Sequence, residues 1–211
     1  MADEKGLFRS IIAHSREDLS SSRAAALSEL IQDRLLRWDR YRAASAILLY
    51  AAHRQEAATD AILAAALASG KAVFYPRLNA GRDRLEVIRI TDRSSLRVGA
   101  YGILEPDGEE TATPESLRQM LVCVPGVAFS SAGDRIGRGG GHYDRLLREI
   151  SPPATSIGLA YSFQLLDELP CEAHDRRLDF VITESAIYPD GIDAPSPARI
   201  SAEEGGPRWR Y

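Results

Sequence analysis

Short apolar runs alternate with helical patterns along most of this chain, and this alternation is what most limits its fold. Runs of this kind, bounded by turn formers, are typical of buried strands. Strands are predicted at residues 46–50, 72–75, 85–90, 121–124, 156–160 and 180–183. Alternation of strand and helix favours an α/β fold with a largely parallel sheet covered on both faces. The run 85–90 is less uniformly apolar, which suits an antiparallel edge.

Helices are predicted from apolar residues at helical spacing and from capping residues. The first helix has a stripe formed by Leu7, Phe8, Ile11, Ile12 and Leu19. The second begins after Ser20 and has a stripe formed by Leu27, Leu30, Ile31, Leu35 and Trp38. We expect both to pack on a sheet. A third runs from Thr59 as N-cap to Gly70, and another starts at Thr113.

A glycine-rich segment, RIGRGGGHYDRLL at 135–147, separates the run 121–124 from a further helical pattern. Backbone without Cβ atoms adopts positive φ and can present N–H groups to an anion at a helix N-terminus. Arg135 and Arg138 add charge and bidentate donors. The segment therefore predicts a phosphate site, with glycine at Gly137, Gly139, Gly140 and Gly141.

The spacing of these glycines excludes two common phosphate loops. A P-loop needs a lysine after its glycines, and a dinucleotide fingerprint needs glycine or alanine where His142 stands. A plain surface turn is the alternative. Arg135 and Arg138 would repel each other without an anion between them, which favours the phosphate interpretation.

Length and charge limit the class of protein. With 211 residues, the chain suits one α/β domain at 1–187, followed by a Pro/Gly-rich tail at 188–211 that we expect to be extended or disordered. A net charge of −4 gives no overall basic field, so we expect no nucleic-acid partner.

The N-terminus and the cysteines bear on location. The N-terminal sequence MADEKGLFRS is charged and has no long apolar segment, so we expect neither a secretory signal nor a membrane span. Cys123 and Cys171 form no CxxC pair, so free thiols in a reducing compartment are expected. These features predict a cytoplasmic protein.

Several polar residues follow the carboxyl ends of predicted strands, where open α/β sheets bind ligands. Glu56 follows the first strand, although an acid there could also stabilise the next helix through its dipole. Asp144 has the same alternative, or it binds Mg²⁺, which takes one or two carboxylates and keeps its other contacts for phosphate and water. Lys5 and Arg9 share a helix face and could clamp a phosphate chain, or be plain surface.

Other chemistries find no support in the sequence. The histidines have no zinc-ligand spacing, and no nucleophile elbow or paired Cys and His is present. If this site carries out chemistry, we expect phosphoryl transfer by positioning and charge and not covalent catalysis.

The chain resembles the 5-formyltetrahydrofolate cyclo-ligase family, over nearly everything before the tail. The most specific segment is VPGVAFSSAGDRIGRGGGHYDR. Supporting matches, in the family's order, are Lys5 with Arg9, Glu56 with Thr59, Gly70-Lys71, Pro76-Arg77, Gly102-Ile103, Glu105-Pro106, His174-Asp175, Leu178-Asp179 and Thr183-Glu184.

The resemblance implies a three-layer α/β/α fold like that of NagB, RpiA and coenzyme A transferase domains. It implies that ATP, as co-substrate, phosphorylates the formyl oxygen of 5-formyltetrahydrofolate with Mg²⁺ as cofactor. N10 then attacks the activated carbon, and phosphate leaves to give 5,10-methenyltetrahydrofolate. The implied partners are these small molecules, and we expect a monomer.

The resemblance also implies residue roles. Arg138 and Tyr143 are the implied catalytic residues, and Asp144 and Asp179 the implied metal ligands. ATP would be bound by Lys5, Arg9, Arg135, Ile136, Gly137, Arg138, Gly139, Gly140, Gly141, His142 and Tyr143. Substrate would be bound by Ala51, Glu56, Tyr101, Arg138, Gly139, Gly140, Gly141 and His142.

Three positions depart from the family's pattern. His142 stands where many members have tyrosine, Gly140 where some have lysine, and Ala51 where a larger side chain can contact substrate. Two other functions stay open at this point. One is a folate- or nucleotide-binding protein without turnover, and the other an enzyme acting on a different phosphate-bearing substrate.

Overall fold

The computed structural model describes residues 2–150 and 154–189, and a seven-stranded sheet forms its centre. The strand order is β12-β11-β9-β6-β1-β2-β3. Neighbours from β11 to β2 pair in parallel, while β3 and β12 pair antiparallel at the two edges. The strands are β1 (Ala46–Leu48), β2 (Ala72–Leu78), β3 (Leu85–Ile90), β6 (Met120–Val124), β9 (Thr155–Leu159), β11 (Phe180–Ile182) and β12 (Ile187–Tyr188). The predicted parallel sheet and the antiparallel edge at 85–90 are both confirmed.

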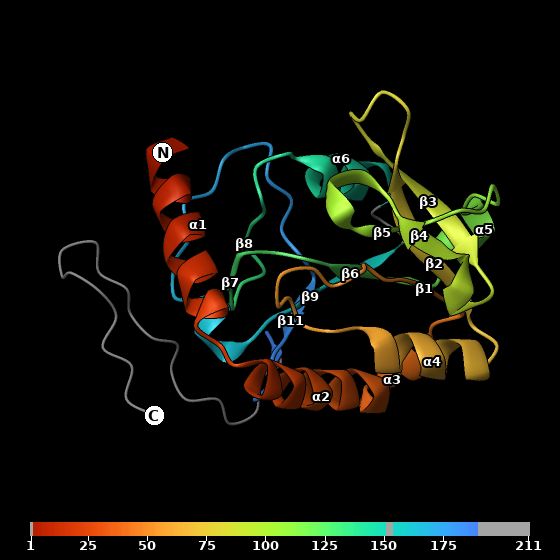
Figure 1. The fold of residues 1–211 in the computed structure, drawn as a ribbon, viewed down its shortest axis with the longest axis horizontal. Helices are drawn as coiled ribbons and strands as arrows, with labels where there is room; N and C mark the ends of the chain where they lie inside the picture. Colours follow the sequence, from red (N-terminus) through yellow and green to blue (C-terminus); the bar gives the residue numbers. More distant parts are fainter. Residues whose placement is uncertain (1, 151–153, 190–211) are drawn as a thin grey trace.

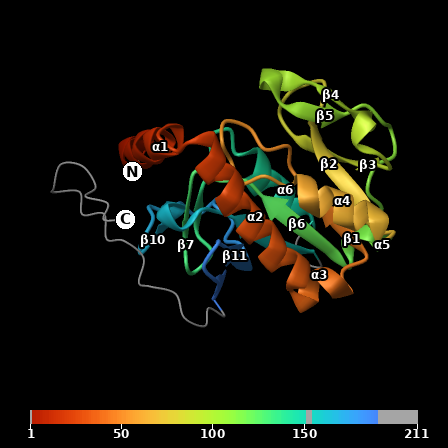
Figure 2. The same cartoon turned by 60° about the horizontal axis from the view of Figure 1, so that its bottom comes forward.

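Helices cover both faces of this sheet, which makes the molecule three-layered (Figure 1). On one face lie α2 (Ser21–Arg37), α3 (Asp39–Ala43) and α4 (Asp60–Ala68). On the other lies α6 (His142–Ile150), and the short α5 (Pro114–Leu117) precedes β6. Figure 2 shows α2 and α4 lying across the strands from that side.

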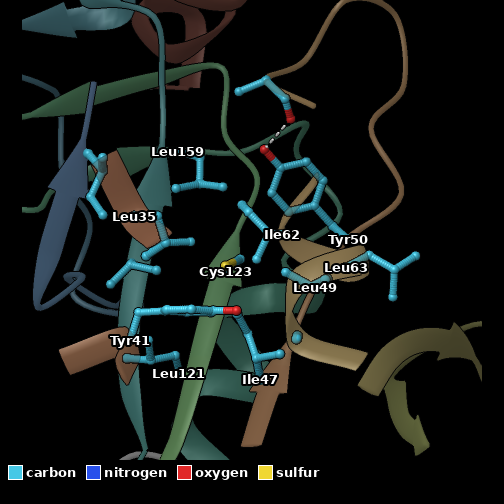
Figure 3. Close-up of a cluster of buried hydrophobic side chains, with 14 of the residues drawn as sticks. Leu35, Tyr41, Ile47, Leu49, Tyr50, Ile62, Leu63, Leu121, Cys123 and Leu159 are labelled. Carbon is cyan, nitrogen blue, oxygen red and sulfur yellow. Dashed lines mark hydrogen bonds between the residues drawn. The ribbon is translucent and has the colours of Figure 1, made fainter. Parts of the chain in front are cut away.

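Alternation along the strands separates two hydrophobic cores. Ile47 and Leu49 face α2 and α4, whereas Ala46 and Leu48 face α6. Figure 3 shows the first core, in which Tyr41 of α3 lies near Leu121 and Ile47. Every residue of β1 and β6 is buried, which explains why the sequences of these central strands are apolar at every position.

The first helix packs on a sheet, as expected, but this sheet is a second and smaller one. α1 (Ala2–Glu17) does not pack on the main sheet; it packs beside β7 (Ala128–Ser130) of a second sheet, ordered β10-β7-β8 (Figure 1). Its buried contact is Ile12, which joins a small core with Val127 and Leu166. Leu7 and Leu30, both on predicted apolar stripes, are half-exposed.

The second sheet also changes how the glycine segment is approached. Between β6 and the glycines the chain forms an antiparallel hairpin of β7 and β8 (Arg135–Ile136), and β10 (Leu165–Leu166) pairs with β7. The predicted direct connection from the main-sheet strand β6 to the loop at residues 137–141, here called the glycine loop, is therefore wrong. Gly133, at φ +91°, allows the turn of this hairpin, whose two short strands are not evident from the apolar pattern of the sequence.

Caps explain where several helices begin and end. Ser20 caps α2 by accepting a hydrogen bond from the Arg23 N–H, and Thr113 forms a capping box with Ser116 at α5. Gly70 follows α4 at φ +72°. Thr59 precedes α4 as predicted, but its hydroxyl caps nothing and instead donates to the Tyr50 carbonyl.

Within the described residues, no helix combines the length and the apolar character needed to cross a membrane. Both cysteines, Cys123 and Cys171, are free thiols, as expected. The tail predicted from residue 188 lies, after Pro189, outside the described residues, so that domain boundary stays a prediction.

Candidate active site

A cavity of about 650 Å³ lies beyond the carboxyl ends of β1, β2 and β6. The glycine loop closes one side, and a hairpin of β4 (Leu96–Val98) and β5 (Leu104–Pro106) closes another. The structure brings every predicted ligand residue except Asp179 to this cavity. Those lining it are Lys5, Arg9, Ala51, Glu56, Tyr101, Arg135, Ile136, Gly137, Arg138, Gly139, Gly140, Gly141, His142, Tyr143 and Asp144.

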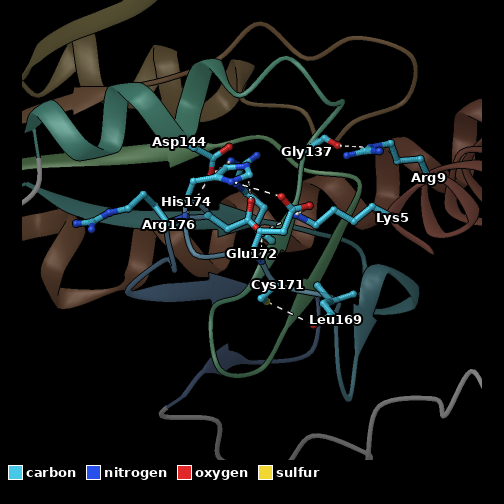
Figure 4. Close-up of polar contacts among 11 residues, drawn as sticks. Lys5, Arg9, Gly137, Asp144, Leu169, Cys171, Glu172, His174 and Arg176 are labelled. Carbon is cyan, nitrogen blue, oxygen red and sulfur yellow. Dashed lines mark hydrogen bonds and ion pairs between the residues drawn. The ribbon is translucent and has the colours of Figure 1, made fainter. Parts of the chain in front are cut away.

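The glycine loop joins β8 to α6 and has the backbone that its sequence predicts. Gly139 has φ +101° and Gly141 has φ +64°, conformations that side chains with Cβ rarely adopt. Arg9 approaches the loop from α1 and donates from Nε to the Gly137 carbonyl at 2.8 Å (Figure 4). The loop therefore lines the cavity together with the guanidinium group of Arg9.

Arg135 and Asp144 form an ion pair beneath this loop. Arg135 Nη2 lies 2.9 Å from Asp144 Oδ1, and their side chains are 3% and 13% exposed. The Arg176 N–H also donates to Asp144 Oδ1. Asp144 lies in the first turn of α6, where the helix dipole favours a carboxylate. The position of Asp144 therefore suits both a carboxylate that stabilises the helix dipole and a carboxylate that binds Mg²⁺.

Lys5 is buried rather than a plain surface residue. Its Nζ lies 2.6 Å from Asp175 Oδ2 and 3.0 Å from Glu172 Oε1, and the side chain extends toward Glu172 and His174 in Figure 4. Burial alone would lower the pKa of Lys5, but hydrogen bonds and charge from Asp175 and Glu172 raise it overall. Lys5 therefore keeps a positive charge at the edge of the cavity.

Glu56 is held by cations as well as by backbone. Arg138 Nη2 lies 2.8 Å from Glu56 Oε1, and the His53 N–H donates to Oε2 at 3.1 Å. The Glu56 side chain is 9% exposed. Since α4 begins at Asp60, Glu56 is outside the helix, and its alternative as a first-turn acid does not hold. The ion pair joins the predicted folate ligand to a predicted phosphate ligand.

The turn before Glu56 is strained. Arg54 and Gln55 have φ +49° and φ +57°, which is uncommon without glycine. Consecutive residues in this region store strain that the surrounding structure must hold. Here the holding contacts are Tyr50, whose hydroxyl donates to the Ala57 carbonyl, and Thr59, whose hydroxyl donates to the Tyr50 carbonyl. The strained turn thus aims Glu56 at the cavity.

Two tyrosines line the cavity in different surroundings. Burial raises the pKa of Tyr143 well above its usual value, so its phenol stays protonated at neutral pH. Tyr101 lies in the 3₁₀ turn Ala100–Gly102 between β4 and β5, at φ +57°, and is 71% exposed. An exposed aromatic ring at a cavity edge is available to stack on a planar ligand.

Asp179 is not brought into the cavity. It precedes β11, at the amino end of that strand, whereas the cavity lies at the carboxyl ends of the parallel strands. Its Oδ2 accepts from the Ser156 N–H at 2.7 Å and from the Ser156 hydroxyl at 2.8 Å. Asp179 therefore does not line the cavity with Asp144, and a metal ion shared by the two carboxylates stays a prediction.

The donor set for a divalent cation is therefore small. No cluster of three or more His, Cys, Asp or Glu suited to a metal ion occurs in the described part of the chain. Asp144 alone still fits Mg²⁺ bound to a nucleotide, because such an ion needs one or two carboxylates and takes its other ligands from phosphate and water. Both hydrogen bonds to its carboxylate end on Oδ1.

The structure adds cavity residues to which the sequence assigned no role. Glu172, His174 and Asp175 arrive opposite Lys5 from a segment far along the chain. His174 and Asp175 were matched to the family only as a motif. Tyr161, which follows β9, is fully buried against α2 and does not line the cavity.

Comparison with known proteins agrees with this geometry. Residues 1–184 match the 5-formyltetrahydrofolate cyclo-ligase family. A probable 5-formyltetrahydrofolate cyclo-ligase of Caenorhabditis elegans is 30% identical over 182 residues, which cover 81% of this chain and 85% of that protein. The mouse 5-formyltetrahydrofolate cyclo-ligase is 26% identical over 180 residues, covering 80% of this chain and 87% of that protein.

Solved structures are similar as well. The 5,10-methenyltetrahydrofolate synthetase of Aquifex aeolicus superposes with a TM-score of 0.78 at 30% identity, covering 90% of this chain and 96% of that chain. The 5,10-methenyltetrahydrofolate synthetase of Mycoplasma pneumoniae superposes with a TM-score of 0.69 at 22% identity, covering 86% and 99%. At that identity the second likeness concerns the fold alone.

Proposed function

Because the chain belongs to the 5-formyltetrahydrofolate cyclo-ligase family, we propose that its cavity carries out the ATP-dependent cyclisation of 5-formyltetrahydrofolate to 5,10-methenyltetrahydrofolate. The γ-phosphoryl group passes from ATP to the formyl oxygen, leaving ADP. N10 then attacks the activated carbon and loses its proton, and the C–O bond breaks as phosphate leaves.

The observation that carries this proposal is one ion pair. Arg138, from the glycine loop, contacts Glu56, from the strained turn after β1, at 2.8 Å. A phosphate donor held by the loop and a pterin held by Glu56 would therefore meet at this point. Transfer between two bound substrates requires that their reacting groups be adjacent.

The chain's own residues supply positioning and charge. Lys5, Arg9 and the backbone of the glycine loop would hold the triphosphate, with Arg138 at the transferred group as charge develops. Tyr143 would donate a hydrogen bond from its protonated phenol. Glu56 and Tyr101 would bind the folate, one by hydrogen bonds to the pterin and one by stacking.

Magnesium belongs to this proposal through Asp144 alone. When bound with ATP, Mg²⁺ would neutralise charge on the phosphate oxygens. Asp144 would hold it while keeping its contact with Arg135, so that pair would fix the carboxylate in place. Asp179 is not included, because its carboxylate is bonded to Ser156 outside the cavity.

Three further properties belong to the same proposal. The three layers support placing the fold with NagB, RpiA and coenzyme A transferase domains. The free thiols of Cys123 and Cys171 support a reducing, cytoplasmic location. We propose a monomer that acts on small molecules, without a nucleic-acid partner, given the net charge of −4.

An assay of the purified protein tests the function directly. With ATP, Mg²⁺ and 5-formyltetrahydrofolate, we expect near-ultraviolet absorbance of the methenyl product to appear only when ATP is present. Binding of folate without product would indicate a binding protein. ATP hydrolysis that ignores folate would indicate a different phosphate-bearing substrate.

The substitution Arg138→Ala tests the assigned division of roles. We expect turnover to fall by about 100-fold or more, as when one transition-state donor is removed, while folate affinity changes much less. Measurement of kcat beside the folate dissociation constant checks this. An equal loss of both would contradict a phosphate role for Arg138.

A further inference from the structure

Arg16, at the end of α1, is a buried arginine that no step of the proposed reaction uses. Its side chain is 7% exposed, and Nη1 lies 3.9 Å from Glu56 Oε1. Its Nε and Nη1 atoms are buried without a hydrogen-bond partner in the described residues. Burial lowers the pKa of Arg16, partly offset by the charge of Glu56. Burying a charged guanidinium group without hydrogen bonds costs free energy, so a compensating interaction is expected for Arg16.

Arg16 extends a row of cations along α1. At 3.6 residues per turn, residues 5, 9 and 16 fall within an arc of about 40° and span about 16 Å of helix. Lys5 reaches Asp175, Arg9 reaches the Gly137 carbonyl, and Arg16 reaches Glu56. One face of α1 therefore contacts three segments that line the cavity, through Asp175, Gly137 and Glu56.

Glu56 Oε1 lies between two guanidinium groups of different exposure. The Arg138 side chain is 42% exposed and lies on the glycine loop, whereas the Arg16 side chain is buried on a helix. If Arg138 turns toward a bound triphosphate, it leaves Glu56, and a buried carboxylate without a partner is costly. Arg16 is then the cation that stays beside Glu56.

We propose that Arg16 is a positioning residue that compensates and orients Glu56 for folate, so that Arg138 is free to serve phosphate. The inference rests on the proposed function and deepens it. Arg16 touches neither substrate, because it does not line the cavity, and acts only through Glu56. Loss of Arg16 should therefore weaken folate binding only while Glu56 is a carboxylate.

A double-mutant cycle tests this coupling. Arg16→Gln should raise the KM for 5-formyltetrahydrofolate about tenfold in the native background, equal to about 1.4 kcal/mol. In the Glu56→Gln background the same change should raise it less than about twofold, because there is no carboxylate left to compensate. Arg16→Lys, which keeps the charge, should restore part of the loss.

A matched control separates positioning from stability. Arg34 is a partly buried arginine that donates to the Thr183 and Glu184 carbonyls far from the cavity. Arg34→Gln should lower the melting temperature and leave the folate KM unchanged. If Arg16→Gln folds poorly, the same cycle with Arg16→Met decides, since methionine fills the buried site and still removes the charge beside Glu56.

The outcomes distinguish this inference from the proposed function. If the native protein forms no methenyl product, the proposed function fails. If the native protein is active but Arg16→Gln raises the folate KM equally in both backgrounds, or not at all, the positioning role is overturned.

Discussion

Lys5 illustrates how one side chain near the N-terminus depends on residues late in the chain. It contacts Glu172 and Asp175 and ties α1 to the 172–175 segment. Burial would raise the pKa of Asp175, but its hydrogen bond with Lys5 and a backbone N–H lower it overall. Each partner therefore stabilises the charged form of the other.

This pair predicts a window of pH dependence. The pKa of Lys5 is raised, so its contribution is complete below its ordinary 10.5 and is lost as pH rises beyond it. The pKa of Asp175 is lowered, so its contribution is complete above its ordinary 3.8 and is lost as pH falls further. Lys5→Met should lower the free energy of unfolding by about 2 kcal/mol at neutral pH.

Urea unfolding of the native and Lys5→Met proteins over a pH series checks this. The difference between them should be constant between about pH 5 and pH 9 and shrink toward both extremes. His14→Ala, on the exposed side of α1, serves as the control and should change little. A difference that stays the same at about pH 3 would contradict the assignment to Asp175.

At the scale of elements, the connection from β1 to α4 determines where Glu56 lies. It leaves β1 at Leu48 and enters α4 at Asp60, and the strained residues Arg54 and Gln55 lie between. Further support comes from α2, where the Ser28 hydroxyl accepts from the Ala58 N–H. The segment is irregular in backbone yet held by hydrogen bonds to its neighbours.

Thr59→Val tests this support. The change removes the hydroxyl that donates to the Tyr50 carbonyl at 2.8 Å and leaves that buried acceptor unsatisfied. We expect a loss of about 1–3 kcal/mol in the free energy of unfolding, with a raised folate KM because Glu56 moves. Chemical denaturation and steady-state kinetics measure the two effects.

The matched control removes a hydroxyl at the other end of the same helix. Ser69→Ala, at the exposed end of α4, should cost less than about 0.5 kcal/mol and leave the folate KM unchanged. Equal effects of the two substitutions would argue against a special role for the Thr59 hydroxyl.

At the scale of the whole molecule, the cavity lies where several parts of the fold meet. α1 and the second sheet provide one wall, the main sheet provides the floor, and the β4–β5 hairpin provides another wall. Ligands that contact all of these parts bind only the folded chain. Their binding free energy therefore adds to the stability of the fold.

Thermal unfolding with ligands measures this linkage. A ligand at 100 times its dissociation constant should add about 2.7 kcal/mol, or roughly 5–10 °C in Tm for a chain of this size. Glu56→Gln should lose the shift from 5-formyltetrahydrofolate and keep that from Mg-ATP. Asp179→Asn, outside the cavity, should keep both shifts. Loss of both shifts in Asp179→Asn would instead place Asp179 in the site.

Local pattern was enough for much of this protein. Apolar runs at 46–50 and 121–124 predicted the central strands, because strands buried on both faces need apolar residues at every position. Glycines at 139 and 141 predicted a loop with positive φ, because only glycine adopts it without strain. The family motifs around that loop predicted the reaction.

Contacts between distant segments were decided by the tertiary structure alone. The sequence alone did not indicate that α1 packs beside β7. It also did not indicate that Arg16 and Arg138 both lie beside the Glu56 carboxylate, or that the Asp179 carboxylate accepts a hydrogen bond from Ser156. Spacing reports neighbours within one element, whereas a charge acts on whatever the fold brings within a few ångströms.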